Sequence, residues 1–293
     1  MIVVTGHNGF LGSRMVEYLK KRGEHTVQVC SDHDLRNYDD VLDLLENAEY
    51  VFHFAANMGG VGYFSKHEYQ PFLDNMQIDL NILKACEELG VKRLFYASSA
   101  CAYSPSLFPL KESMLEYSHQ PDKLYGWEKL TITKVAAKAP FEVRVGILHT
   151  IYGEGQQHEG EKAKFPPALA LKAIRAIRTD QLEVWGDGEQ TRTFLHVDDA
   201  IQMMYEVMFA TEYHGAVNIS STEQVKINQC VEWVCEYLNI KPAIVHNMEA
   251  PVGTYNRGAD MSKFHQYYQY RQQISTKEGF CRLIDWMRRE GIA

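Results

Sequence analysis

Short apolar runs alternate with amphipathic stretches through the first half of the chain. The runs are rich in β-branched and aromatic residues and predict buried strands at 2–4, 27–29, 50–54, 93–98 and 141–148. Between them, apolar residues recur at helical spacing and predict helices at 12–21, 41–45, 75–89 and 122–137. Strands that alternate with helices in this way predict a parallel, doubly wound α/β sheet of the Rossmann type.

The pattern changes after Tyr152, where a polar loop containing glycines leads to Pro166-Pro167. Beyond it we predict helices up to about 178, from 198, at 227–239 and at 276–289, and strands at 182–185 and 217–219. We therefore expect two units, residues 1–150 and a smaller α/β unit over residues 151–293, with some chain crossing back.

The composition excludes some classes of partner. The 293 residues are 45% hydrophobic and 23% charged, an ordinary globular mixture, and the net charge is −8. Nucleic acids and anionic membranes attract basic surfaces, so we expect neither as a partner. No apolar run approaches the roughly 18 residues that span a bilayer, and the N-terminus leads into a strand without a signal peptide. We therefore expect a cytoplasmic protein.

The six cysteines show neither a CxxC pair nor paired zinc spacing. In a reducing compartment they should be free thiols, and we expect no metal site. Five of them lie in apolar patterns typical of core packing. Cys101 differs, because it lies among small and polar residues in ASSACAY, directly after a predicted strand.

The stretch TGHNGFLG joins the first predicted strand to the first helix and contains Gly6, Gly9 and Gly12. Such glycines allow a tight turn, close approach of a pyrophosphate and close packing of the helix on the strand. The helix N-terminus then offers unpaired N–H groups to the phosphates. Asp32 lies 20 residues beyond the last glycine, where an acid bonds the ribose 2′-hydroxyl. We therefore predict NAD as the cofactor, with NADP as the alternative that Arg14 and Arg36 leave open.

Tyr125 and Lys129 lie four residues apart in YGWEK, on one face of a predicted helix. A phenol has a pKa near 10 and is a poor base at neutral pH. A neighbouring ammonium and a positively charged nicotinamide lower that pKa. We therefore predict that the pair takes a proton from a substrate hydroxyl while hydride leaves its carbon.

Ser99 and Cys101 are two residues apart on a segment that we expect to be extended, so their side chains should point the same way. They follow a parallel strand, and open α/β sheets bind ligands beyond the carboxyl ends of such strands. Ser99 would hydrogen-bond the reacting hydroxyl. Cys101 would reach the adjacent carbons, since a thiol has a pKa near 8.5 and exchanges protons near neutrality more readily than a hydroxyl. A packed cysteine without chemistry is the alternative.

Together these residues resemble the extended short-chain dehydrogenase/reductase family of nucleotide-sugar enzymes, over essentially the whole chain. The shared motifs are GHNGFLG, FHFAA, SSACAY, YGWEK and WGDGEQTRTFLHVDD. Within the family, AANMGGVGYF and EKAKFPPALALKA resemble the GDP-mannose 3,5-epimerase branch most, and the GDP-fucose synthase branch next. The resemblance implies an NAD-binding first unit, a second unit that binds a GDP-linked nucleotide-diphosphate sugar, and a homodimer.

The resemblance also implies an acid–base pair. In the epimerase branch a cysteine and a lysine exchange protons with the sugar ring from opposite faces, and Cys101 matches the cysteine. Counting back from Pro166 and Lys172 places the lysine at Lys164, whereas the local string Glu-Lys-Ala points to Lys162. We predict Lys164, because the same register makes Lys172 the second substrate lysine of the family.

Binding residues follow from the resemblance as well. For the cofactor it implies Phe10, Ala55 and Ala56, with Asp34 and Leu35 at the adenine. For the substrate it implies Gly59, Thr150, Lys172 and Gln190 at the sugar, and Arg192 and Arg257 at the diphosphate, where guanidinium forks suit phosphate oxygens. Thr150 stands where the branch has Asn, and the segment between the second and third strands is short. These departures affect the expected sugar more than the expected reaction.

The expected activity is an epimerisation in which hydride leaves the sugar 4-position, Cys101 and the lysine invert neighbouring carbons, and hydride returns. The alternatives are a GDP-4-keto-6-deoxy-sugar 3,5-epimerase/4-reductase that consumes NADPH, and a nucleotide-sugar 4-epimerase, which does not need the thiol. A non-catalytic NAD-binding protein is the alternative from another class.

Overall fold

A parallel sheet of six strands forms the centre of the molecule, in the order β2-β1-β3-β4-β5-β9. The computed structural model describes residues 1–24, 27–29, 33–210 and 213–292. The strands of this sheet are β1 (Ile2–Thr5), β2 (Val27–Val29), β3 (Tyr50–His53), β4 (Arg93–Ser99), β5 (Glu142–Leu148) and β9 (Val217–Ile219). The predicted doubly wound parallel sheet is confirmed.

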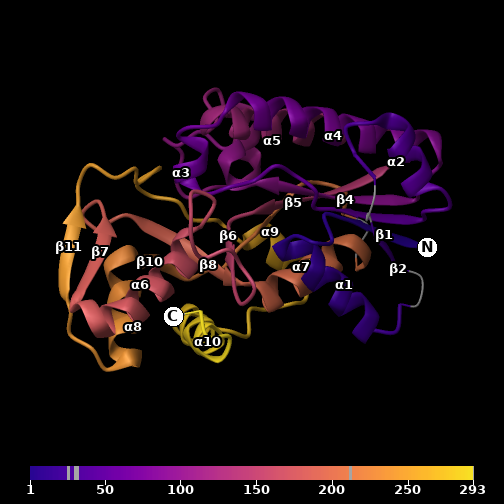
Figure 1. Ribbon diagram of the computed structural model, residues 1–293. Coiled ribbons are helices and arrows are strands. Elements are labelled where there is room, and N and C mark those ends of the chain that lie inside the picture. Colours follow the sequence, from indigo (N-terminus) through magenta and orange to yellow (C-terminus); the bar gives the residue numbers. More distant parts are fainter. Residues whose placement is uncertain (25–26, 30–32, 211–212, 293) are drawn as a thin grey trace.

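Helices cover both faces of this sheet (Figure 1). One face carries α2 (Tyr38–Leu45), α4 (Tyr69–Glu88) and α5 (Lys123–Ala136), and the other carries α1 (Phe10–Lys21), α7 (Val197–Phe209) and α9 (Ser262–Tyr267). Alternate residues of a strand point to opposite faces. Val4 accordingly packs in the cluster under α1 and α7, and Val3 packs in the cluster under α2 and α4.

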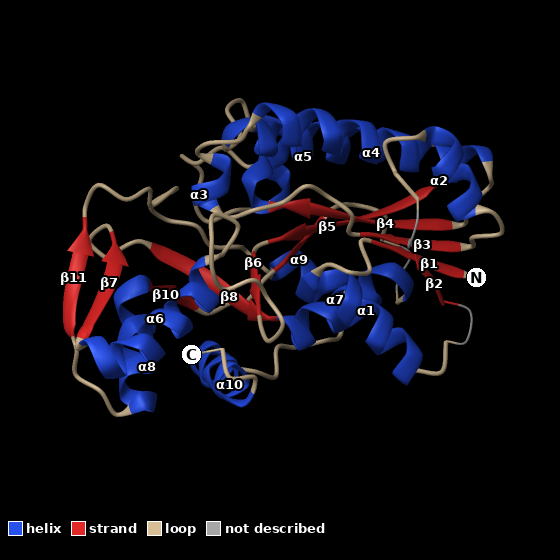
Figure 2. Ribbon diagram, in the orientation of Figure 1, coloured by secondary structure: helices blue, strands red, loops and turns tan. Residues whose placement is uncertain are grey.

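A smaller unit beside this sheet holds two short sheets (Figure 2). Three strands form one of them, β6 (Thr150–Tyr152), β8 (Thr191–His196) and β10 (Gln224–Lys226), and two form the other, β7 (Gln181–Trp185) and β11 (Ala243–Asn247). Three helices pack on them around a second core, α6 (Phe165–Thr179), α8 (Ile227–Leu238) and α10 (Thr276–Arg289). Short helical segments complete the chain at α3 (Val61–Phe64), 100–102 and 112–117.

The chain returns to the first sheet after entering the smaller unit, since α7, β9 and α9 all pack there. The division at residue 150 stays a prediction. None of the helices in the described part of the chain is long and apolar enough to cross a membrane. The cysteines at 86, 101, 230, 235 and 281 are free thiols, whereas Cys30 and Asp32 lie outside the described residues.

The strand order reverses beside β1, because the chain runs from β1 to β2 on one side and then to β3 on the other. A reversal of this kind opens a crevice beyond the carboxyl ends of the two strands, where open α/β sheets bind their ligands. Gly6 follows β1 and Ala55 follows β3, so both lie at this crevice.

Candidate active site

The turn after β1 leaves no room for side chains at two of its glycines. Gly6 has a φ of +67°, and a Cβ there would lie 2.7 Å from the backbone nitrogen of Ala55. A Cβ on Gly12 would clash with the carbonyl oxygen of Gly6, so α1 packs closely on the turn. Gly9 is the N-cap of α1 and supplies no side-chain hydrogen bond to its first N–H groups. These free donors at a helix N-terminus fit a pyrophosphate.

The predicted adenine contacts are only partly available. The side chain of Leu35 is buried in the core beneath α2. Asp34 is exposed, and two hydrogen bonds from Arg36 lower the pKa of its carboxyl to about 2. Arg14, the other candidate for a 2′-phosphate, bonds the backbone oxygen of Glu154 and lies 3.6 Å from its carboxylate. Both arginines are therefore engaged in ion pairs within the protein.

A cavity at the crevice brings together most of the predicted reaction residues. We call it the central cavity, and its lining includes Phe10, Ala55, Ala56, Ser99, Tyr125, Lys129 and Lys164. These residues come from the turn before α1, the ends of β3 and β4, helix α5 and the start of α6. Elements from both units therefore border the same space.

The segment after Ser99 is not extended, and that prediction was wrong. The Ser99 side chain accepts a hydrogen bond from the Cys101 backbone N–H at 3.2 Å and caps a short 3₁₀ turn over residues 100–102. The backbone N–H of Asp122 donates to the Cys101 carbonyl at 3.0 Å and holds the turn against α5. Serine competes in this way with strand continuation wherever its hydroxyl can reach a backbone N–H. Both residues nevertheless affect the pKa of the Tyr125 phenol, which Cys101 raises and Ser99 lowers.

Burial and the charge of Lys129 act in opposite directions on the pKa of the Tyr125 phenol. Tyr125 is buried, with the Phe64 ring stacked on it at 4.8 Å. Burial raises its pKa above 10, while Lys129 and a hydrogen bond with Ser99 oppose the rise. The Lys129 ammonium lies 5.9 Å from the Tyr125 ring centroid. The net shift of the pKa is upward, because the effect of burial exceeds that of Lys129.

Lys129 belongs to a buried polar network that we did not predict. Its ammonium lies 2.8 Å from Glu128 and 3.6 Å from Asp79, and it donates to the Tyr96 hydroxyl at 3.1 Å. Asp79 also contacts the His53 ring at 2.9 Å. Burial works against the charged form of Lys129, but the two carboxylates raise its pKa well above 10.5. The ammonium is therefore held firmly beside Tyr125.

Cys101 lies between a guanidinium and a carboxylate. Arg257 donates toward its sulfur with Nη1 at 3.4 Å, and the second nitrogen, Nη2, pairs with Asp122 at 2.6 Å. Asp122 is the N-cap residue of α5 but makes no cap hydrogen bond, because its carboxylate faces Arg257 and the thiol. Arg257 therefore contacts the residue predicted to exchange protons.

Two arginines lie near Cys101. Burial and the neighbouring Arg257 lower the pKa of Arg192 to about 10. Arg192 donates to the backbone oxygens of Val252 and Tyr255 and has no carboxylate partner among the described ion pairs. Two guanidinium groups this close favour an anion between them, and a diphosphate has the matching geometry.

The two candidate lysines of the loop before α6 have different surroundings. Lys164 is the N-cap residue of α6 and lines the central cavity. Burial lowers its pKa, and Cys101 partly opposes that effect. Lys162 is exposed, with its ammonium 4.7 Å from the Tyr63 ring centroid and 3.4 Å from Asn57. Of the two, Lys164 is the one at the cavity.

The remaining predicted substrate residues lie apart from the cavity lining. A Cβ on Gly59 would clash with the Tyr63 side chain, and Gly60 packs against the loop that carries the two lysines. Lys172 pairs with Glu183 at 2.7 Å, and Gln190 donates to the Trp185 carbonyl at 3.0 Å. Thr150 lies on β6, in register with Phe194 of β8. Lys172 and Gln190 thus gather around β7.

Three comparisons with known proteins agree with this geometry. Residues 2–220 match the NAD dependent epimerase/dehydratase family. GDP-mannose 3,5-epimerase of Arabidopsis thaliana is 30% identical over 315 residues, which cover 99% of this chain and 82% of that protein. GDP-L-fucose synthase 1 of the same plant is 28% identical over 302 residues, covering 97% and 92%. The structure of MoeE5 in complex with UDP-glucuronic acid and NAD is similar with a TM-score of 0.85 and 26% identity, covering 99% of both chains.

Proposed function

The chain belongs to the NAD dependent epimerase/dehydratase family, and we propose that it is an NAD-dependent nucleotide-sugar epimerase similar to GDP-mannose 3,5-epimerase. The observation that carries the proposal is that Lys164 lines the central cavity together with Ser99 and Tyr125. Cys101 lies in the turn that Ser99 caps, and it affects the pKa values of both Lys164 and Tyr125. A lysine and a thiol flanking a redox-type tyrosine suit proton exchange at carbons next to a transient ketone. Similarity to the plant epimerase over almost the whole chain supports the substrate class.

The residues around the first turn fit a nicotinamide dinucleotide. The uncapped N–H groups of α1 suit its pyrophosphate, and the turn at Gly6 keeps the backbone close to β3. Phe10, Ala55 and Ala56 border the cavity beyond them. When bound, the cofactor supplies a hydride acceptor for the sugar C4 and later a hydride donor. We propose NAD, because Arg14 and Arg36 are both paired within the protein.

Tyr125 is the proposed proton carrier for the C4 hydroxyl. Burial keeps it protonated, so it becomes a base only when the positive charge in the cavity outweighs the effect of burial. Lys129 is held in place by Glu128 and Asp79 and supplies part of that charge. Ser99 lowers the pKa of Tyr125, lines the same cavity and would position the reacting oxygen.

Cys101 and Lys164 are the proposed acid–base pair for the neighbouring carbons. Inversion requires that a proton leaves one face of the sugar ring and returns to the other. Cys101 follows β4 and Lys164 precedes α6, so the two groups come from different units. Burial lowers the pKa of Lys164 and brings its neutral form closer to the working pH. Arg192 and Arg257 would hold the diphosphate, and Gly59, Thr150, Lys172 and Gln190 the sugar.

Product analysis with cofactor accounting tests this proposal. The protein is incubated with GDP-mannose and a catalytic amount of NAD, and the sugars are identified by NMR. We expect epimerised GDP-sugar and no lasting rise in absorbance at the NADH wavelength. A fucose synthase-like activity, which the 28% identical relative favours, would instead consume NADPH in proportion to a reduced 4-keto sugar. Turnover of UDP-sugars alone would contradict the proposed GDP-linked substrate.

We also propose that the protein is a homodimer that pairs through α4. Tyr69, Leu73 and Leu80 lie on one face of this helix and are exposed. Exposed apolar side chains in a row on a long helix are typical of a protein interface. A second copy of the chain would cover them.

A further inference from the structure

His149 occupies the wall of the central cavity between β5 and β6. It is only 8% exposed, and its backbone N–H donates to the Ile219 carbonyl at 3.2 Å. The Nδ1 atom of its ring is buried and has no hydrogen-bond partner among the described residues. A buried polar atom without a partner costs roughly 1–3 kcal/mol, so a donor group of a ligand that reached Nδ1 would be favoured there.

Asn218 fixes the tautomer of His149. The Asn218 amide nitrogen donates to the carbonyl oxygens of Leu110 and Asp260, so its amide oxygen must face the other way. That oxygen accepts from the Tyr103 hydroxyl at 2.9 Å and lies 3.3 Å from His149 Nε2. Because this oxygen can only accept, Nε2 carries the hydrogen, and Nδ1 is left with a lone pair.

The ring stays neutral at any working pH. Burial, together with a smaller effect of the nearby Arg257, lowers the pKa of His149 to about 3, although the contact with Asn218 opposes this shift. Nδ1 is therefore a permanent acceptor, and its partner must be an N–H or O–H donor. A neutral ring also leaves room for a positively charged group beside it.

The other walls of the cavity identify the donor. Phe10, Leu148 and Ile151 are apolar walls that suit a flat ring, and Tyr125 and Lys129 lie beside them. Cys101, Gln190, Arg192 and Arg257 do not line the cavity in the described part of the chain, so this space belongs to the cofactor end of the site. On the nicotinamide ring, the carboxamide NH₂ is the only hydrogen-bond donor.

We infer that His149 Nδ1 accepts a hydrogen bond from the carboxamide NH₂ of the nicotinamide ring. The inference rests on the proposed use of a nicotinamide cofactor. This bond would fix the rotation of the ring about its link to the ribose, and so determine which face of the ring meets the sugar. His149 is thereby a specificity residue for the cofactor.

Two substitutions of His149 test the acceptor atom Nδ1 and the donor group Nε2–H separately. In His149→Asn, the amide oxygen replaces Nδ1, and the donor toward Asn218 is lost. In His149→Gln, the amide nitrogen reaches the place of Nε2, and the acceptor is lost. Dissociation constants are measured by titration calorimetry for NAD and for 3-acetylpyridine adenine dinucleotide, in which a methyl group replaces the NH₂. Thermal melting of each variant reports on folding.

The inference predicts that His149→Asn binds NAD like the wild type, and that His149→Gln binds it about tenfold more weakly. All three proteins should bind the acetylpyridine analogue equally, because it offers no donor. If His149 only supports Asn218, His149→Asn should bind NAD more weakly than His149→Gln and should melt at a lower temperature. That result would overturn the inference.

Other outcomes also have defined meanings. Equal loss of affinity for NAD and the analogue in His149→Gln refutes the carboxamide bond. If His149→Gln binds NAD normally but GDP-mannose more weakly, the partner of Nδ1 is a sugar hydroxyl. That result also refutes the carboxamide bond. A wild type that binds neither NAD nor NADP defeats the proposed function and this inference together. NAD binding that is indifferent to residue 149 defeats this inference alone.

Discussion

Lys162 and Lys164 lie two residues apart in one loop, yet they meet different surroundings. Lys164 borders the central cavity, where burial lowers its pKa. Lys162 is exposed above the Tyr63 ring. Only a lysine that loses its proton at moderate pH can accept one from carbon, and desolvation is the physical route to that state. The proposed acid–base role therefore belongs to Lys164.

Replacing each lysine in turn separates the two. Lys164→Met removes the amine but keeps a similar chain length, and we expect the epimerisation rate to fall about 10²–10⁴-fold, the range for a lost general acid or base. Lys162→Met is the matched control and should retain most of the activity. Rates are measured by NMR with GDP-mannose. Equal losses in both variants, or a larger loss in Lys162→Met, would contradict the assignment.

Site residues were predictable where one element carries them. Tyr125 and Lys129 share a turn of α5, and Cys101 lies in the 3₁₀ turn that directly follows Ser99 at the end of β4, so their spacing in the sequence reports their proximity. Arg257 and Cys101 are 156 residues apart, and no local pattern predicts their contact. The buried Asp79 was missed although it lies on the buried stripe of α4, where a charged residue signals a buried partner.

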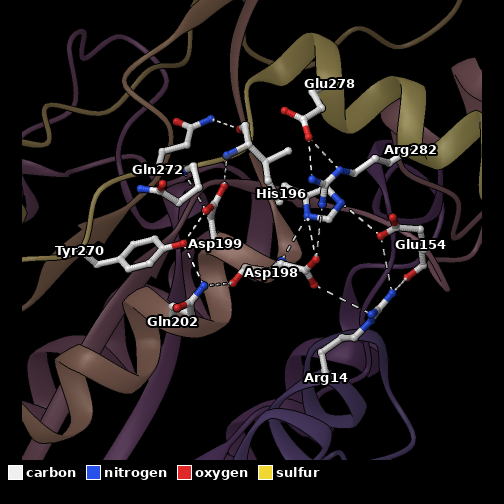
Figure 3. A network of polar contacts seen from close by, with 12 residues as sticks. Arg14, Glu154, His196, Asp198, Asp199, Gln202, Tyr270, Gln272, Glu278 and Arg282 are labelled. Carbon is white, nitrogen blue, oxygen red and sulfur yellow. Dashed lines mark hydrogen bonds and ion pairs between the residues drawn. The ribbon is translucent and has the colours of Figure 1, made fainter. Parts of the chain in front are cut away.

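At the level of elements, a polar network ties three helices together (Figure 3). Glu154 lies between Arg14 of α1, at 3.6 Å, and the His196 ring before α7, at 3.1 Å. Arg282 of α10 reaches Asp198 at 4.0 Å. Burial alone would raise the pKa of Glu154, but His196, backbone hydrogen bonding and Arg14 lower it to about 2. The ionised carboxylate therefore stabilises the junction of the two units.

This network predicts a pH-dependent loss of stability. A carboxyl whose pKa falls from 4.5 to about 2 on folding contributes stability above pH 4.5 and loses it as the pH falls toward 2. Glu154→Gln should lower the free energy of unfolding by about 2 kcal/mol at pH 7. Urea unfolding at several pH values measures this difference, which should shrink below pH 4.5. A difference that is constant from pH 7 to 3 would refute it.

Strands with continuous apolar runs were predictable, and exposed or mixed ones were not. The five runs of the first half became β1 to β5 because both faces of that sheet are covered. β11 was missed, since its residues are largely exposed and pairing with β7 holds it in place. α4 begins at Tyr69 and not at 75, because Pro71 fits the first turn of a helix. Such effects depend on tertiary neighbours.

At the scale of the whole molecule, the site forms where the two units meet. The first unit supplies the turn after β1, Cys101 and Tyr125, and the second supplies Lys164 and Arg257. Neither unit alone holds both proposed acid–base groups. The exposed apolar face of α4 lies on the outer side of the first unit, with α5 beside it (Figure 1). Pairing there would leave the central cavity free.

The proposed dimer can be tested on α4. Leu73 and Leu80 are 42% and 44% exposed, and a Leu73→Glu/Leu80→Glu protein should become monomeric, because two charges oppose burial of that face. Ile177→Glu is the control, since Ile177 is 49% exposed on α6. Molar mass is measured by light scattering after gel filtration. A monomeric wild type, or a double variant that stays dimeric, would contradict pairing through α4.

The most direct test of the proposed activity is proton exchange in heavy water. The wild type is incubated with GDP-mannose and NAD in D₂O, and deuterium is located by NMR. We expect deuterium at the carbons beside C4, loss of this exchange in Cys101→Ala, and normal exchange in Cys235→Ala, whose thiol belongs to the second core. Turnover by the wild type without deuterium at those carbons would contradict the acid–base step, and with it the proposed epimerase.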